Sequence, residues 1–188
     1  MTVYTESGLR FDLPDDQHFR FADMAPYKSL SGRNLKEMDF AWVSNGSLIV
    51  LEVRSYEQVT STLTGADLMP VKGQPMPHRF QALIDKVTDS LLMLLAAWAG
   101  SAWGQQLKAS LPAAAQGIMP LKVVIAVELP ASLKVHLQAL RDGLNARLQG
   151  RAGTVDVRRV ALIDYARLTS DPTFKGKVTA QLLAPTAR

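Results

Sequence analysis

Residues 37–54 read Glu-Met-Asp-Phe-Ala-Trp-Val-Ser-Asn-Gly-Ser-Leu-Ile-Val-Leu-Glu-Val-Arg, a pattern that predicts a β-hairpin. Large apolar residues recur at every second position from Met38 to Trp42, which is the period of a strand. Asn45-Gly46 is a strong hairpin-turn signal, because both central residues of such a turn need positive φ. The run that follows is apolar on both faces, so we expect a second strand that is buried on both sides.

This buried strand contains two charged residues, Glu52 and Arg54, which share one face because they lie two positions apart. A lone buried carboxylate would cost several kcal/mol or take up a proton, so these charges suggest a purpose. If Asp39 begins the first strand, the hairpin can bring it alongside Glu52. Two carboxylates and a cation at one end of a sheet can hold a hard divalent ion and a phosphate.

Asp39 followed after the turn by Glu52-Val53-Arg54 resembles the motif of the PD-(D/E)XK nuclease superfamily, which has the restriction-endonuclease-like fold. Met38 stands where the motif has Pro, and Arg54 stands where the catalytic Lys is expected. The resemblance implies that Asp39, Glu52 and the carbonyl of Val53 bind Mg²⁺ or Mn²⁺. It also implies an endonuclease that hydrolyses nucleic-acid phosphodiester bonds, in a setting such as bacterial defence or DNA repair.

Arg54 keeps the positive charge of the expected lysine but not its chemistry. Its guanidinium stays protonated and can donate two hydrogen bonds to a phosphate or a carboxylate, so it could stabilise a transition state but cannot act as a base. In the resembling family the catalytic lysine can be displaced to the following helix, which makes Lys86 the candidate for that role. The alternative is a surface Lys86 paired with Asp85 or Asp89.

Three functional hypotheses follow. The first is the metal-dependent nuclease, with Mg²⁺ or Mn²⁺ between Asp39 and Glu52. The second is a catalytically silent member of the same fold that serves as a nucleic-acid-binding or assembly subunit, with Arg54 folded onto the two carboxylates. The third is an unrelated α/β protein in which the motif is a coincidence and the two carboxylates lie far apart.

The chain after the hairpin predicts an α/β fold class, a mixed sheet flanked by helices. An apolar stripe with helical spacing and a terminal Gly100 indicate the first helix. The predicted elements are helix 78–99, strand 121–129, helix 131–148 and strand 155–163. This order matches the restriction-endonuclease-like core over residues 37–163, although the usual first helix of that core, before Asp39, is not evident.

Before the hairpin, the sequence predicts short strands and a loop. Leu9–Leu13 and His18–Phe21 alternate on either side of a turn signal, and we expect them to form a small hairpin at the edge of the sheet. His18 has no partner at metal-ligand spacing, so we expect a surface histidine. Residues 24–36 predict a polar loop that is either solvated or contacts phosphate on the approach to Asp39.

Glu37 lies two positions before Asp39 and would share its face on a strand. It is either a further carboxylate of the site or a partner of Lys36 or Arg33.

Three other segments have weaker patterns. After residues 55–58, residues 59–77 predict a long loop, which is a lid, a nucleic-acid clamp or an insertion. We expect a loose connection over 101–120 and a short final strand over 178–183.

Composition limits the class of protein. The 188 residues are 47% apolar and 20% charged, which predicts one globular domain over residues 1–188. The absence of cysteine excludes disulfides, thiolate zinc sites and cysteine nucleophiles, and it suits a cytoplasmic protein. No secretion signal is visible, and the longest apolar run, Leu91–Ala99, is too short to span a membrane.

The net charge of +4 is a mild bias toward polyanions, and we expect a nucleic-acid partner, DNA in the first instance. Basic residues concentrate in 134–167, which is either an ordinary solvated surface or a phosphate-facing patch. No recognition module is visible, so we expect specificity to come from a homodimer or a partner subunit.

Overall fold

The computed structural model describes residues 1–30, 32–57 and 63–180, which form a mixed α/β structure with two sheets. The larger sheet has the strand order β3-β4-β5-β6-β7 and the smaller one the order β1-β2-β8. The strands of the larger sheet are β3 (His18–Phe19), β4 (Phe40–Ser44), β5 (Ser47–Ser55), β6 (Leu121–Glu128) and β7 (Ala161–Asp164). Those of the smaller sheet are β1 (Thr2–Glu6), β2 (Leu9–Leu13) and β8 (Val178–Ala180).

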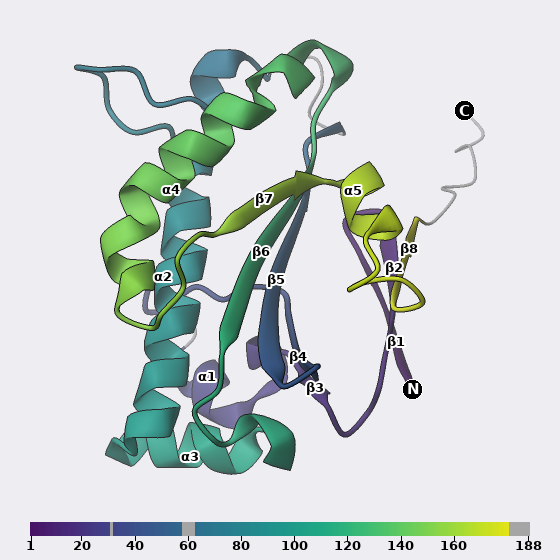
Figure 1. The fold of residues 1–188 in the computed structure, drawn as a ribbon. Coiled ribbons are helices and arrows are strands. Elements are labelled where there is room, and N and C mark those ends of the chain that lie inside the picture. The colour runs from purple at the N-terminus through teal and green to yellow at the C-terminus, as the bar shows by residue number, and fades with distance from the viewer. Residues whose placement is uncertain (31, 58–62, 181–188) are drawn as a thin grey trace.

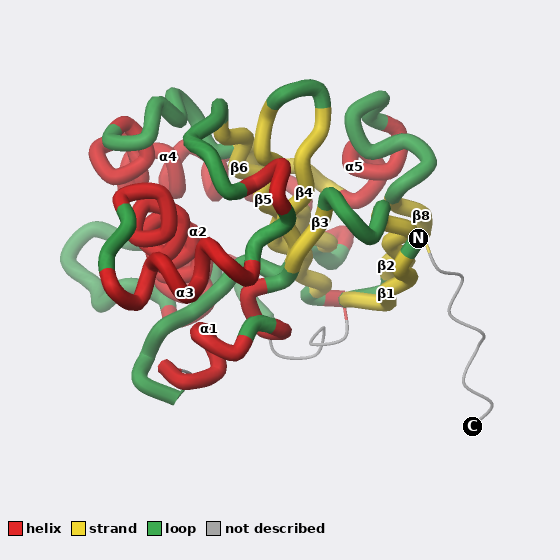
Figure 2. Tube along the Cα trace, turned by 90° about the horizontal axis from the view of Figure 1, so that it is seen from below, coloured by secondary structure: helices red, strands yellow, loops and turns green. Residues whose placement is uncertain are grey.

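The helices are α1 (Ala25–Leu30), α2 (His78–Ala99), α3 (Ala102–Ser110), α4 (Leu137–Gly153) and α5 (Tyr165–Ser170). Figure 1 shows α2 and α4 on one side of the larger sheet and the smaller sheet with α5 on the other. The view from below in Figure 2 shows the same separation, with α1 and α3 beside α2. Among the described residues, no helix combines the length and the apolar character needed to cross a membrane.

The predicted hairpin is confirmed. Strands β4 and β5 pair antiparallel, and Ser44 faces Ser47 across the turn. Asn45 and Gly46 have φ values of 49° and 69°, the positive values that this two-residue turn requires. Strand β4 begins at Phe40, one residue after Asp39.

Strand β5 is buried on both faces, as predicted, because it separates two apolar cores. Leu48 and Val50 pack in the core beneath the helices. Ile49, Leu51 and Val53 pack in the core shared with the smaller sheet. Since side chains alternate along a strand, Glu52 points to the helix face together with Leu48 and Val50.

Helix α2 has the predicted bounds, and Gly100 ends it with a φ of 75°. The loose connection predicted after it is wrong, because α3 follows directly. Ser101 caps α3 by accepting a hydrogen bond from the Gly104 N–H at 3.1 Å. The alanine-rich sequence has little helical apolar period, and packing against the end of α2 supplies the stabilisation that the pattern does not show.

Two of the later elements also differ from the prediction. The predicted strand 155–163 is much shorter, since β7 starts only at Ala161. The Asn145 side chain bonds both the N–H and the carbonyl of Val160, at 2.9 and 3.0 Å, and so holds the residue before the strand against α4. The predicted helix 131–148 begins as a 3₁₀-helix, η5 (Ala131–His136), and continues as α4 to Gly153.

The predicted N-terminal hairpin is wrong. Strand β2 pairs with β1 and β8 in the smaller sheet, whereas β3 pairs with β4 in the larger one. His18 is not a surface residue, because its ring contacts the Tyr4 hydroxyl at 2.9 Å and the Pro14 carbonyl at 2.6 Å.

Two shorter segments complete the comparison. The predicted loop 24–36 contains the short helix α1. Of the predicted strand 178–183, β8 covers Val178–Ala180 and the rest lies outside the described residues.

The contact between α2 and α3 generates a stability prediction. A Cβ placed on Gly104 would lie 1.9 Å from the main-chain oxygen of Ala96, so Gly104→Ala has to push the two helices apart. We expect it to lower the free energy of unfolding by about 3 kcal/mol. Gly150→Ala in α4 is the control, because its Cβ would meet nothing within 4 Å, and it should raise stability by about 0.5–1 kcal/mol. Urea unfolding measures both, and equal effects would contradict the close packing.

Candidate functional site

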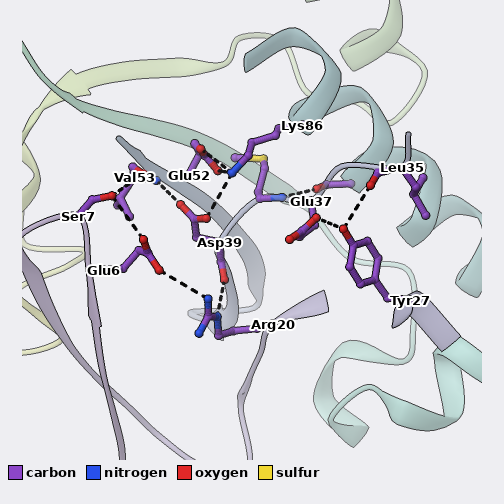
Figure 3. A network of polar contacts seen from close by, with 12 residues as sticks. Glu6, Ser7, Arg20, Tyr27, Leu35, Glu37, Asp39, Glu52, Val53 and Lys86 are labelled. Carbon is purple, nitrogen blue, oxygen red and sulfur yellow. Dashed lines mark hydrogen bonds and ion pairs between the residues drawn. The ribbon is translucent and has the colours of Figure 1, made fainter. Parts of the chain in front are cut away.

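The hairpin brings Asp39 and Glu52 together. The register pairs Phe40 with Leu51, so the next position on each chain places Asp39 across from Glu52. Both side chains reach the ammonium of Lys86, which comes from α2 (Figure 3). The Lys86 Nζ lies 2.8 Å from the Glu52 carboxylate and 3.4 Å from Asp39 Oδ1. The third hypothesis required the two carboxylates to lie far apart, and the structure places them close together.

Asp39 is held by groups that the sheet leaves unpaired. Because β4 begins at Phe40, the main chain of Val53 has no strand partner on that side. The Val53 N–H donates to Asp39 Oδ2 at 2.8 Å, and its carbonyl accepts a hydrogen bond from the Ser7 hydroxyl at 3.4 Å. Arg20 Nε donates to the main-chain carbonyl of Asp39 at 3.2 Å. The orientation of Asp39 is thus fixed from β5 and from the N-terminal segment.

The polar face of α2 positions the chain that leads into β4. The Lys36 N–H donates to Asp89 at 2.9 Å, and the Lys36 ammonium pairs with Asp85 at 2.7 Å. The Met38 N–H donates to the Ser90 hydroxyl at 2.9 Å. Both acids of α2 that could have paired with Lys86 are therefore engaged by Lys36, and Lys86 is left to the two site carboxylates.

Glu37 takes neither of its predicted roles. Its carboxylate accepts a hydrogen bond from the Tyr27 hydroxyl, on the side away from Asp39 (Figure 3). The segment 35–39 is not part of a strand, so the two-residue period that placed Glu37 beside Asp39 does not apply.

The electrostatics of the site follow from burial. The Glu52 side chain is 2% exposed, against 15% for Asp39 and 22% for Lys86. Burial and the nearby Asp39 carboxylate raise the pKa of Glu52 to about 8, although Lys86 opposes the shift. Burial alone would lower the pKa of Lys86, but its two carboxylate neighbours raise it. The two raised pKa values have different causes. Lys86 has two anionic neighbours that favour its charged form, whereas Glu52 has one cation, one anion and little water around it.

A cavity of about 430 Å³ opens beside these residues, between the end of β5 and the start of α2. Glu52 and Lys86 line its inner wall, and the exposed Arg54 lines it further along β5. In the described part of the chain, Arg54 makes no ion pair with Asp39 or Glu52. The second hypothesis required Arg54 to fold onto the two carboxylates, and among the described residues it does not.

The donor set was tested for a fit to Mg²⁺ or Mn²⁺. Within residues 1–30, 32–57 and 63–180, no cluster of three or more His, Cys, Asp or Glu side chains could hold a metal. Mg²⁺ commonly uses only one or two carboxylates and completes its shell with water and substrate oxygens. The Asp39 and Glu52 carboxylates meet that lower requirement, and a bound divalent ion would replace the proton that burial favours on Glu52. The residues fit a magnesium-type site and not an all-protein cage.

Ser7 and Arg20 were missed by sequence reasoning. They reach the site only because the smaller sheet packs on the larger one, and neither stands at a recognisable spacing from Asp39.

A scan against protein-family models finds no match, and searches of curated proteins and of solved structures find none either. The function of the chain is therefore inferred from the geometry of the residues described above.

The raised pKa of Glu52 predicts a pH-dependent stability. From about pH 4.5 to about pH 8, the folded chain keeps a proton on Glu52 that the unfolded chain loses, so this residue makes stability fall as pH rises. Glu52→Gln removes the effect. We expect the free energy of unfolding of the variant, relative to wild type, to rise by about 4 kcal/mol between about pH 5 and about pH 9 in EDTA.

Asp85→Asn is the control for this experiment. Burial opposes ionisation of Asp85, but Lys36 and Gln81 lower its pKa, so it stays charged throughout that range. Its stability difference from wild type should not change with pH. Parallel curves for wild type and Glu52→Gln would contradict the assignment of the raised pKa.

Proposed function

We propose that the protein is a metal-dependent nuclease that hydrolyses phosphodiester bonds in nucleic acid, with DNA as the first substrate to test. The observation that carries the proposal is the convergence of the Asp39 and Glu52 carboxylates on the Lys86 ammonium beside an open cavity. The mixed sheet with its hairpin, helix and parallel strands supports the resemblance to the restriction-endonuclease-like fold.

The site residues have distinct roles in the proposed reaction. Asp39, Glu52 and the carbonyl of Val53 would hold Mg²⁺ or Mn²⁺, which when bound polarises a phosphate and lowers the pKa of water. Lys86 keeps its ammonium within hydrogen-bonding distance of Glu52 and is reachable from solvent. It would orient the attacking water or stabilise the negative charge that develops on the phosphate.

Arg54 has a separate role in this proposal. It points from the same face of β5 as Glu52 but farther out, along the cavity wall. Its guanidinium stays protonated, so it would bind phosphate oxygens and would not transfer protons.

A second candidate function is the catalytically silent form, a binding or assembly subunit. One observation favours it: the Lys86 ammonium lies between the two carboxylates and partly neutralises them. If that ion pair persists in the presence of divalent ions, the site is closed by Lys86 and not by Arg54.

Metal titration separates the two candidates. We expect calorimetry to detect Mg²⁺ and Mn²⁺ binding to wild type and to find none in Glu52→Ala, which removes a carboxylate ligand. Asp142→Ala removes an exposed carboxylate of α4 and should bind as wild type does. Absence of binding in wild type would support the silent form.

Cleavage assays test the role of Lys86. We expect Mg²⁺- or Mn²⁺-dependent cleavage of at least one of supercoiled plasmid, linear duplex, single-stranded DNA and RNA. Lys86→Met should lower the cleavage rate by about 10²–10³-fold, because it removes the cation nearest the carboxylates. Lys108→Met, a change of equal charge in α3, should stay within about twofold of wild type. Equal rates for the two variants would exclude Lys86 from the reaction.

A further inference from the structure

The cavity next to the carboxylates has a second, cationic wall, of which the proposed reaction uses only Arg54. Arg79, in the first turn of α2, lines the cavity beside Tyr56, the residue that follows β5. Its guanidinium lies over the ring of Tyr56, 5.7 Å from the ring centroid. Arg54 completes this wall from β5. We call Arg54, Tyr56 and Arg79 the cationic wall.

The charges of the cationic wall are only partly compensated in the described part of the chain: hydrogen bonds from Thr64 and the nearby charge of Arg79 lower the pKa of Asp67, but no ion pair forms. Neither Arg54 nor Arg79 is within ion-pair distance of a carboxylate there. The other acid that lines the cavity, Asp67, is exposed and accepts hydrogen bonds from Thr64, its neighbour in a short 3₁₀ segment. Two guanidinium groups facing one cavity indicate an anionic ligand, and phosphate matches their forked geometry.

Tyr56 positions one of the two guanidinium groups of the cationic wall. It lines the cavity, yet only 2% of its surface is exposed. The ring is the surface on which the Arg79 guanidinium lies, so Tyr56 holds that cation at the cavity.

We propose that the cationic wall is a subsite for a second phosphate of the substrate, next to the phosphate that is cleaved. The inference rests on the proposed function for the location of the cleaved phosphate. The second phosphate is either an internal phosphodiester of the strand or a terminal phosphomonoester, and both present the same oxygens to the guanidinium groups. Substrate binding would therefore depend on Arg54 and Arg79 even when no metal is present.

The test is a binding measurement in EDTA, where no metal-dependent cleavage occurs. The probes are two short single-stranded DNAs of one sequence, each with fluorescein at the 3′ end, one with a 5′ phosphate and one with a 5′ hydroxyl. We expect Arg54→Gln and Arg79→Gln each to weaken binding about 10-fold, because each removes charge-assisted hydrogen bonds.

The matched control is Arg10→Gln, which changes the charge equally on the exposed strand β2. It should alter binding by less than about twofold, the size of a general electrostatic effect. Losses confined to the 5′-phosphorylated probe identify a terminal phosphate, and equal losses with both probes identify an internal one. Inorganic phosphate should compete in the first case only.

Two results would overturn the subsite: wild type that binds neither probe, or arginine variants that match Arg10→Gln. The outcome is separable from that of the proposed nuclease activity. Cleavage with an unchanged KM in both arginine variants would retain the nuclease and remove the subsite. Binding that depends on the arginines without any cleavage by wild type would retain the phosphate site and remove the nuclease.

Discussion

The buried carboxylate of Glu52 is the constraint around which the site is built. A carboxyl group that is 2% exposed in the middle of a sheet needs a hydrogen-bonding partner, and Lys86 supplies it from α2. The same ammonium also lies near Asp39, so strand β5, the start of β4 and helix α2 must keep their relative positions for the pair to persist. Buried ion pairs seldom add net stability compared with apolar residues of similar size. The cost of keeping charges here is therefore more readily explained by a chemical role than by folding.

The fold was predictable from sequence where the decisive interactions are local. The hairpin turn depends on Asn45-Gly46, and α2 depends on its own apolar period and on Gly100, so both were predicted correctly. The pairing of β2 with β8 joins the two ends of the described chain, and no local pattern indicates it. Likewise, α3 is stabilised by close packing at Gly104, and β7 is shortened by side-chain bonds from Asn145. Each of these needs the tertiary structure to be known first.

The residues of the site also fall into two groups, those that local sequence patterns predicted and those that only the tertiary structure brings in. The sequence predicted that Asp39 and Glu52 lie side by side, because the register of a hairpin is a local property. Lys86 was a candidate because the helix that carries it follows the hairpin along the chain. Ser7 and Arg20 contact the site from the N-terminal region across a sheet packing that periodicity cannot predict. Arg79 and Tyr56 meet because the start of α2 lies against the end of β5. The sequence thus predicted the carboxylates and their ammonium but not the walls that surround them.

The replacement of the expected lysine by Arg54 is explained by this division of labour. Glu52 already has an ammonium partner, because Lys86 lies 2.8 Å from its carboxylate. A lysine at position 54 would not be needed for that contact. A second ammonium there would repel the first without adding a hydrogen-bond geometry that the site lacks. Arginine at position 54 is exposed and lines the same cavity, and it makes no ion pair with a carboxylate among the described residues. A forked cation that is always charged suits the binding of phosphate oxygens, so in the proposed nuclease the two cations would have separate functions: Lys86 at the carboxylates and Arg54 toward the substrate.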